Sequence, residues 1–406
     1  MKSQTVSNIK RQTRSHKSIY LGCFYSFFVN GGIALILGAI LPYIKSSYEL
    51  DYVIAGILLV ANSVGNLIAS FTGGIVPIYL GRRRSILLFC SAGVLGFVLM
   101  TITSNPFLLV MAFFLTGVNR GAVSNFNNTV INEIAKEKGA ALNILHSVFA
   151  IGAFLSPFIA MAFVSRNADG WKYIAYIWAL LCFFELFTYG FMNIPNNKPM
   201  AKEKKSKMSN LDFLKNKYYL TACAILFFYL CAEQAVNGWL VTYFIESGIL
   251  SNDLAQTMAS LLWLVILFGR LLTAYLSSKV KKSKLLLINA LGYVVFFTVL
   301  LLSRSVVPVI LGIVGVGFCM SGLYPTTVAS IGKILKEYPI GLSFMMVFSG
   351  LGATLMPGIV GGVAEKIGIL GGMSTVIVAV ILTLFFIIYN AYINRGVEED
   401  AVSIRQ

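Results

Sequence analysis

Apolar segments of membrane-spanning length alternate with short polar connections along this chain. A helix crosses the ~30 Å hydrocarbon core of a bilayer with about 20 residues, and the apolar blocks reach that length. The hydrophobicity fills whole blocks and does not follow the 3.6-residue stripe of a helix lying on a soluble core. We therefore expect an all-α membrane protein with twelve transmembrane helices. They are predicted at residues 19–42, 52–79, 84–103, 106–132, 140–165, 171–193, 218–246, 254–278, 284–303, 306–331, 339–364 and 370–394.

One connection, residues 194–217, is longer than the others. It is basic, contains two prolines and cannot lie in hydrocarbon. It predicts a cytoplasmic linker between an N-terminal six-helix bundle (19–193) and a C-terminal six-helix bundle (218–394). Residues 1–18 and 395–406 are expected to be cytoplasmic tails. Two pseudo-symmetric halves are the layout of transporters built from repeated bundles.

Charged residues are scarce, and the positive ones gather in alternate loops. Only 12% of the 406 residues are charged, against about 25% in a soluble protein. If the N-terminus is cytoplasmic, 25 of the 32 lysines and arginines fall on the cytoplasmic side and 5 on the opposite side. This split predicts a multi-pass membrane protein with both termini inside. We expect it to lie in the plasma membrane. The net charge of +16 then has anionic lipid headgroups as its partner and does not indicate nucleic-acid binding.

The cysteines and histidines exclude several classes of site. All six cysteines fall in apolar segments, which argues against a disulfide framework, and none has metal-ligand spacing. With only two histidines in the chain, we expect no metal site and no cofactor. No cleavable signal peptide is expected at the N-terminus. We expect the protein to be a monomer.

The seventh predicted helix carries polar residues in its middle, namely Glu233, Gln234 and Asn237. A carboxylate at membrane depth costs at least ~2.5 kcal/mol, so it normally faces a bundle interior or a watery cavity. Trp239 and Tyr243 follow toward the outer end of this helix. An acid, amides and aromatic rings near the midplane suit a polar, ring-shaped ligand. The alternative is a polar contact that only joins helices.

The fourth predicted helix is rich in amides around a mid-span arginine. Ser124 lies one turn after Arg120, and Asn127 and Asn128 lie two turns deeper. Because each amide offers both donors and acceptors, this group suits a substrate with hydroxyl groups. Arg120 either binds an anionic substrate or pairs with Glu233, since two unpaired charges in the membrane would be costly. An ion pair with a purely structural role is the alternative.

Other polar residues within the predicted helices have less specific roles. His146 either relays protons or is a hydrogen-bonded core residue, and Asn143 has a similar status. Arg270, toward the cytoplasmic end of the eighth helix, is expected to snorkel or to form a gate. Glu133 is expected to be a charge at the end of the fourth helix. Glu185, in the sixth helix, has no assigned partner.

The loop after the second predicted helix reads Gly73-Gly-Ile-Val-Pro-Ile-Tyr-Leu-Gly-Arg-Arg-Arg84. It resembles the signature of the major facilitator superfamily, which is a glycine, an acid and then Gly-Arg-Arg/Lys. Ile78 stands where the family has its aspartate, so the charge relay of that family is not carried over. A plain positive loop on the cytoplasmic side is the alternative. The resemblance implies a conformational or gating role for Gly74, Gly81, Arg82 and Arg83, and we add Arg270 to this group.

Three further stretches resemble the fucose permease branch of the superfamily, the sugar:proton symporters. They are Leu142-Asn143 with Gly152-Ala153, Tyr229 through Tyr243, and Ser321-Gly-Leu-Tyr-Pro-Thr326. The resemblance implies twelve helices in two pseudo-symmetric six-helix bundles, the major facilitator fold. It also implies that helices 1, 4, 7 and 10 line a central cavity, which would bring Arg120 and Glu233 together.

The carboxylates depart from the fucose permease pattern. The first helix has no acid, and Ser124 stands where that branch has a glutamate. Glu233 stands where it has a glutamine, so the acid has moved between bundles. We therefore expect Glu233 to couple protons, with His146 as a second candidate.

These observations predict a secondary active transporter of a sugar or related polyhydroxy compound, proton-coupled and working by alternating access. Uptake of a sugar acid or other carboxylate through Arg120 is one alternative. Export of drugs or metabolites is another, although the amides of the fourth helix argue against it. An enzyme is not expected, because no catalytic constellation occurs at one depth. The expected substrate-binding residues are Asn30, Arg120, Ser124, Asn127, Asn128, Asn143, Gln234, Asn237, Trp239, Tyr243 and Tyr324.

Overall fold

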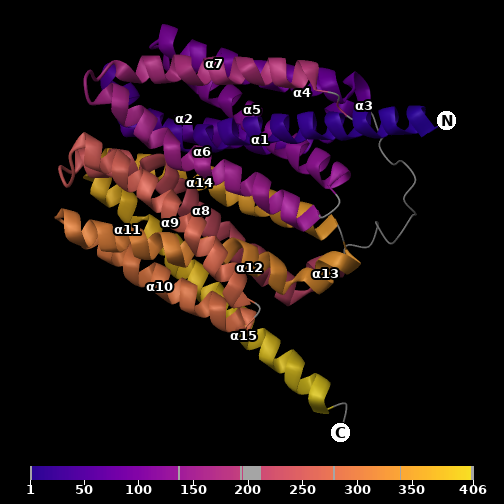
Figure 1. Ribbon diagram of the computed structural model, residues 1–406. Helices are drawn as coiled ribbons and strands as arrows, with labels where there is room; N and C mark the ends of the chain where they lie inside the picture. The colour runs from indigo at the N-terminus through magenta and orange to yellow at the C-terminus, as the bar shows by residue number, and fades with distance from the viewer. Residues whose placement is uncertain are drawn as a thin grey trace. The chain divides into compact units, whose positions relative to one another are not determined.

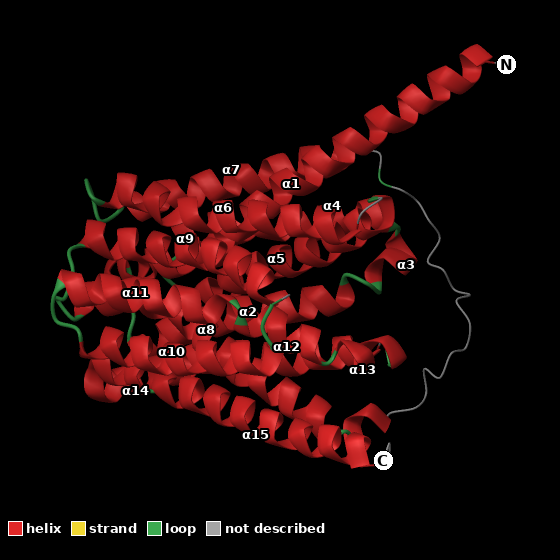
Figure 2. Cartoon of the chain, turned by 60° about the horizontal axis from the view of Figure 1, so that its bottom comes forward, coloured by secondary structure: helices red, strands yellow, loops and turns green. Residues whose placement is uncertain are grey.

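A computed structural model describes most of the chain, and all of its regular elements are helices (Figures 1 and 2). The described residues are 2–135, 138–192, 194, 212–277, 279–338 and 340–403. Side chains are not described at 2–16, 138–140, 143, 336 and 394–403. The chain forms two compact units: Met1–Leu50 with Leu58–Ala201, and Asp51–Ile57 with Lys202–Gln406.

The first unit is a bundle in which α1 packs mainly on α6, and α4 packs on α5 and α7. A single helix, α1, replaces the predicted tail and first span, and it begins at Lys2. Asn105 starts α5 by accepting hydrogen bonds from the backbone N–H groups of Phe107 (2.9 Å) and Leu108 (3.4 Å), which an N-cap requires. The helices are α1 (Lys2–Ser47), α2 (Tyr52–Thr72), α3 (Val76–Leu80), α4 (Arg82–Ile102), α5 (Pro106–Ile134), α6 (Lys138–Val164) and α7 (Gly170–Phe191). The first six residues of α2 are counted with the second unit.

The second unit is organised around α8, on which α14 and α15 pack, while α11 packs on α9 and α10. Asn216 caps α8 as Asn105 caps α5, by accepting from the N–H groups of Tyr218 and Tyr219 at 2.9 and 3.2 Å. Most of the predicted linker lies outside the described residues. The elements are η1 (Asp212–Lys215), α8 (Lys217–Glu246), α9 (Asn252–Ser277), α10 (Lys282–Leu302), α11 (Val306–Ser321), α12 (Leu323–Ser330), α13 (Gly332–Glu337), α14 (Ile340–Ser374) and α15 (Val376–Ser403).

Within the described residues, eleven stretches are long and apolar enough to cross a membrane. The last, Ile340–Ile393, has 54 residues and would be roughly 80 Å long as one helix, far more than a bilayer core. Its backbone leaves the helical region at Ile367 and at Gly368, where φ is 79°. The two spans predicted in this region therefore both exist, on either side of this break. The all-helical membrane fold is confirmed.

Two predicted spans are each interrupted, which the hydropathy pattern did not indicate. The second ends at Thr72, and Gly73 to Ile75 turn the chain before the short helix α3. The tenth breaks at Gly322, between α11 and α12. Pro325 explains this break, because a proline has no N–H to donate to the carbonyl of Ser321 four residues earlier.

A buried polar network ties three helices of the first unit together. Asn127 in α5 donates through Nδ2 to Ser26 Oγ in α1 at 2.8 Å. Its Oδ1 accepts from the hydroxyl of Tyr189 in α7 at 2.9 Å. All three side chains have no exposed surface. Since unpaired polar groups are costly in an apolar interior, this network fixes how α1, α5 and α7 meet.

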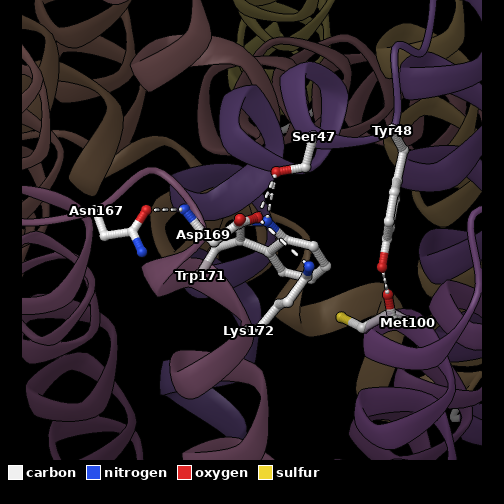
Figure 3. A network of polar contacts seen from close by, with 7 residues as sticks. All are labelled: Ser47, Tyr48, Met100, Asn167, Asp169, Trp171 and Lys172. Atoms are coloured by element: carbon white, nitrogen blue, oxygen red, sulfur yellow. Dashed lines mark hydrogen bonds and ion pairs between the residues drawn. The ribbon is translucent and has the colours of Figure 1, made fainter.

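A second polar network joins the C-terminal end of α1 to the start of α7 (Figure 3). The indole N–H of Trp171 donates to Ser47 Oγ at 3.0 Å, and Ser47 Oγ donates to Asp169 at 3.1 Å. Asp169 also pairs with Lys172 at 3.4 Å. The ring of Tyr48 meets Trp171 edge-on, and its hydroxyl donates to the carbonyl of Met100 at 3.0 Å. These contacts close one end of the first unit around a buried tryptophan.

Substitution Asn127→Leu is expected to destabilise the first unit by about 1–3 kcal/mol, because it leaves the Ser26 and Tyr189 hydroxyls without their amide partner. Thermal unfolding in detergent measures this loss. Asn128→Leu is the matched control, since Asn128 is half-buried and, among the described residues, bonds within its own helix, to the Ser124 carbonyl. Equal melting temperatures for the two variants would contradict the structural role of Asn127.

Arg82 at the start of α4 and Glu133 near the end of α5 form a two-pronged ion pair, with nitrogen–oxygen distances of 2.6 and 2.7 Å. The side chains are 18% and 27% exposed. We expect a double-mutant cycle with Arg82→Gln and Glu133→Gln to give a coupling of about 1 kcal/mol in unfolding free energy, since bidentate pairs exceed ordinary surface pairs. If the losses of unfolding free energy in the two single variants add up to the loss in the double variant, this pairing is contradicted.

Candidate functional site

In the first unit, a polar group from three helices surrounds Arg120. The guanidinium of Arg120 donates through one terminal nitrogen to Asn62 Oδ1 in α2 at 2.9 Å. Asn62 Nδ2 donates in turn to Thr116 Oγ1 at 3.0 Å. Asn30 in α1 donates to the backbone carbonyl of Arg120 at 2.9 Å. The arginine is thus held by neutral amides, and its positive charge is not neutralised by them.

Two glycines in α5 allow α2 to approach this closely. A Cβ atom at Gly117 would lie 2.0 Å from the carbonyl oxygen of Asn62. One at Gly121 would lie 2.1 Å from the carbonyl oxygen of Asn66. Only residues without a side chain fit such contacts between helices. The sequence therefore brings Asn62 to Arg120 through the spacing of these glycines.

Arg120 keeps hydrogen-bonding capacity for a ligand. Its side chain is half-buried, and its Nε is a buried donor with no partner. Ser124 and Asn128 follow at intervals of four residues on the same face of α5, and both are half-buried. Asn128 Nδ2 donates to the Ser124 carbonyl at 2.8 Å, which leaves its Oδ1 as an acceptor. A charged donor and neutral polar groups are therefore aligned along this face.

In the second unit, Glu233 on α8 interacts with tyrosine hydroxyl groups and one arginine. Glu233 is 8% exposed. The Tyr229 hydroxyl, one turn earlier, lies within hydrogen-bonding reach of its carboxylate, and Arg270 from α9 acts on it electrostatically. Tyr293 from α10 and Tyr324 from α12 also interact with its charge. Four elements thus converge on one buried acid.

Arg270 continues this group toward Asn237 through an aromatic ring. Its guanidinium carbon lies 6.0 Å from the centre of the Trp263 ring, a distance that suits a cation–π contact. The indole N–H of Trp263 donates to Asn237 Oδ1 at 3.3 Å. Asn237 and its neighbour Gln234 are both half-buried. In this unit, Arg270 supplies a positive charge that acts on Glu233, and its gating role stays a prediction.

Three predicted substrate residues are instead packed in the interior of their units. Asn127 belongs to the buried network described above. Trp239 is fully buried and donates to the carbonyl of Pro357 in α14 at 3.0 Å. Tyr243 is fully buried and donates to the carbonyl of Leu301 in α10 at 3.3 Å. Their polar atoms are used within the fold and their surfaces are covered in this structure, and a ligand-binding role for these three stays a prediction.

The remaining predicted residues are placed as follows. His146 is exposed on α6 and packs edge-on against Phe27, with ring centres 5.3 Å apart, so it is not buried in the core, which was one of its two predicted roles. The side chain of Asn143 lies outside the described residues. Tyr324 is half-buried, with its ring 6.4 Å from that of Tyr229. The hypothesised pair of Arg120 with Glu233 stays a prediction.

The predicted gating loop adopts a specific backbone form. Gly81 has φ 79°, and no atom lies within 4 Å of the position that a Cβ would take. Glycine is therefore favoured there by the positive φ and not by a lack of room for a side chain. Gly74 lies in the turn before α3. Arg83 is exposed, whereas Arg82 pairs with Glu133, which is therefore more than a helix-end charge.

Sequence reasoning missed four residues of these groups. Asn62 is a polar residue at the middle of an apolar segment, the signal that had drawn attention to Glu233. Tyr229 precedes Glu233 by one helical turn, and that spacing also points to contact. Trp263 and Tyr293 gave no such signal, because aromatic residues are common in apolar helices.

Comparison with known proteins finds relatives that align over most of their length with most of this chain. "Bypass of stop codon protein 6" of Saccharomyces cerevisiae is 21% identical over 407 residues, 90% of this chain and 79% of the relative. The "Sodium-dependent glucose transporter 1A" of Mus musculus is 20% identical, over 83% of this chain and 88% of the relative. The "Gallate transporter" of Pseudomonas putida is 21% identical, over 86% and 85%.

The structural comparison and the family comparison agree on the class of protein. A crystal structure of a D-xylose-proton symporter superposes with a TM-score of 0.74 at 14% identity, covering 92% of this chain and 96% of that one. The profile of the Major Facilitator Superfamily matches residues 23–321, which is most of the chain. An enzyme is thereby excluded, as expected, and this multi-pass membrane protein belongs to the Major Facilitator Superfamily of secondary transporters.

Proposed function

We propose that the protein takes up a sugar or related polyhydroxy compound across the plasma membrane, coupled to protons, by alternating access. The observation that carries this proposal is the buried Glu233, set among Tyr229, Tyr293 and Tyr324 with Arg270 beside it. An acid that can exchange a proton lies there together with the half-buried Tyr324, whose hydroxyl can bond a polyol. The distribution of lysine and arginine supports a cytoplasmic location of both termini.

Neutral polar groups support a hydroxylated substrate. Gln234 and Asn237 in the second unit, and Ser124 and Asn128 in the first, are half-buried on membrane-spanning helices. Each can donate and accept hydrogen bonds, which is what a sugar ring offers in return. Two similar proteins, a glucose transporter and a xylose symporter, carry sugars in their names. We propose that the protein is closest in function to the fucose permease branch of the superfamily.

Arg120 supports a carboxylate as the second candidate substrate. Its Nε has no partner, and its described partners are neutral amides, so an anion would complete its hydrogen bonding. The similar gallate transporter is named for a carboxylate. Export of drugs or metabolites has no comparable support, since the half-buried positions of these helices are amide-rich.

Protons are the coupling ion that we propose, although one similar protein is named sodium-dependent. A buried carboxylate beside one arginine changes the balance of charge around it when it gains a proton. That change can bias one conformation over another only if the two conformations differ in affinity for the proton. The exposed His146 on α6 remains a second proposed proton carrier.

We expect Glu233→Gln to abolish accumulation of substrate driven by a proton gradient while leaving substrate counterflow in proteoliposomes. The amide keeps the size and hydrogen bonds of the acid but cannot release a proton at neutral pH. Glu337→Gln is the control, because Glu337 is an exposed glutamate of the same unit. Accumulation by Glu233→Gln at the wild-type level would remove Glu233 from coupling. Loss of both activities with normal folding would assign it to substrate binding alone.

Uptake of a labelled panel of neutral hexoses, deoxyhexoses and sugar acids separates the two substrate classes. We expect accumulation of a neutral sugar, with Arg120→Lys raising its KM about tenfold or less, because lysine keeps the charge but loses the guanidinium geometry. Accumulation of acids alone, abolished in Arg120→Lys, would establish the carboxylate alternative. Sodium in place of protons as the driving ion would overturn the coupling proposal and leave the sugar assignment intact.

A further inference from the structure

Glu185 is a second buried acid, and the proposed transport site does not use it. It lies in α7 of the first unit and has no exposed surface. Leu181, one turn earlier, accepts the hydroxyl of Tyr25 through its carbonyl at 2.9 Å, so α1 covers this side of α7. A charged group in so apolar a place would need a partner of opposite charge or ligands that replace water.

The groups facing Glu185 are neutral. Asn119 from α5 donates through Nδ2 to Glu185 Oε2 at 2.9 Å. The thiol of Cys90 from α4 lies beside the carboxyl group, and Cys182 and the Tyr25 hydroxyl are also near. Among the described residues, no lysine or arginine acts on Glu185. A carboxylate here would therefore keep an uncompensated charge.

The hydrogen bonding of the Glu185–Asn119 cluster is incomplete when the glutamate is ionised. Two buried oxygens in this cluster have no hydrogen-bond partner, Glu185 Oε1 and Asn119 Oδ1. They belong to the two side chains that already share one hydrogen bond. Both oxygens are acceptors when the glutamate is ionised, so they cannot bond each other. One proton on Oε1 turns it into a donor.

We propose that Glu185 binds a proton in this structure and forms a two-bond acid–amide pair with Asn119. The amide N–H of Asn119 donates to Oε2, and the protonated Oε1 donates to Asn119 Oδ1. The proton comes from water and returns to it, and no other bond forms or breaks. The pair satisfies both unpaired oxygens with a single ligand.

The surrounding helices are shaped for this pair. A Cβ atom at Gly93 in α4 would lie 2.9 Å from Asn119 Cγ and Nδ2, so glycine makes room for the amide. A metal ion fits the cluster poorly, because hard cations take about six or more oxygen ligands and the described part of the chain offers two unpaired oxygens here. Asn119 and Arg120 are consecutive residues of α5, so they point about 100° apart around that helix. The proton site and the Arg120 site therefore occupy different faces of one helix.

Infrared spectra of the full-length protein in lipid vesicles at pH 7 test this proposal without any transport assay. Wild type should show a carbonyl-stretching band of a protonated carboxylic acid that Glu185→Gln lacks. Glu133→Gln is the matched control, since the partly exposed Glu133 pairs with Arg82 and lies outside this cluster, and it should keep the band. If Glu185→Gln instead lowers the carboxylate band and leaves the acid band unchanged, Glu185 is ionised and the proposal is wrong.

A second variant tests the pairing itself and serves if Glu185→Gln does not fold. Asn119→Ala should move the acid band to higher frequency, because the acid loses both hydrogen bonds to the amide. A band at the same frequency in Asn119→Ala and wild type would overturn the acid–amide pair. Thermal stabilisation of wild type by sodium chloride over choline chloride, absent in Glu185→Gln, would instead indicate a bound cation and also overturn it.

Discussion

Hydrogen bonding in a medium without water is the constraint on which this structure depends. Backbone groups are satisfied within each helix, but side-chain polar groups in the bundle interiors must find partners on neighbouring helices. Asn127 does so with Ser26 and Tyr189, and Arg120 does so with Asn62. Each pairing fixes the rotation of the helices that carry it, because a turn of one helix would leave a polar atom unpaired. The positions of these few residues therefore specify how otherwise uniform apolar helices pack.

Close helix contact is the second requirement, and glycine supplies it. A Cβ atom at Gly31 in α1 would lie 2.0 Å from the carbonyl oxygen of Phe149 in α6, and one at Gly152 in α6 would lie 2.0 Å from that of Phe28. These reciprocal contacts hold α1 and α6 together along one line. In lipid, where association gains little from burying apolar surface, such approach strengthens van der Waals contact. The same arrangement between α2 and α5 brings Asn62 to Arg120.

The membrane-spanning helices could be predicted from sequence, but the direction in which each polar side chain points could not. Blocks of hydropathy placed the spans, and the polar residues within them marked Glu233 and Arg120. Trp239 and Tyr243 lie on the same helix as Glu233, yet they turn into the packed interior of the second unit. An apolar helix with polar residues on several sides has no stripe that tells its buried face from its open one. The partners of Glu233 come from α9, α10 and α12, and no local pattern connects those segments.

The native thiols decide how this protein can be probed in solution. Five of the six cysteines, Cys23, Cys90, Cys182, Cys223 and Cys231, are buried, and Cys319 is half-buried. A water-soluble maleimide reacts with thiolates that it can reach, so the five buried thiols give little background labelling. Cysteines introduced along α5 and α8 would then report access to water position by position. Replacing Cys319 alone prepares the chain for that mapping, and the buried network around Cys23 and Cys90 stays intact.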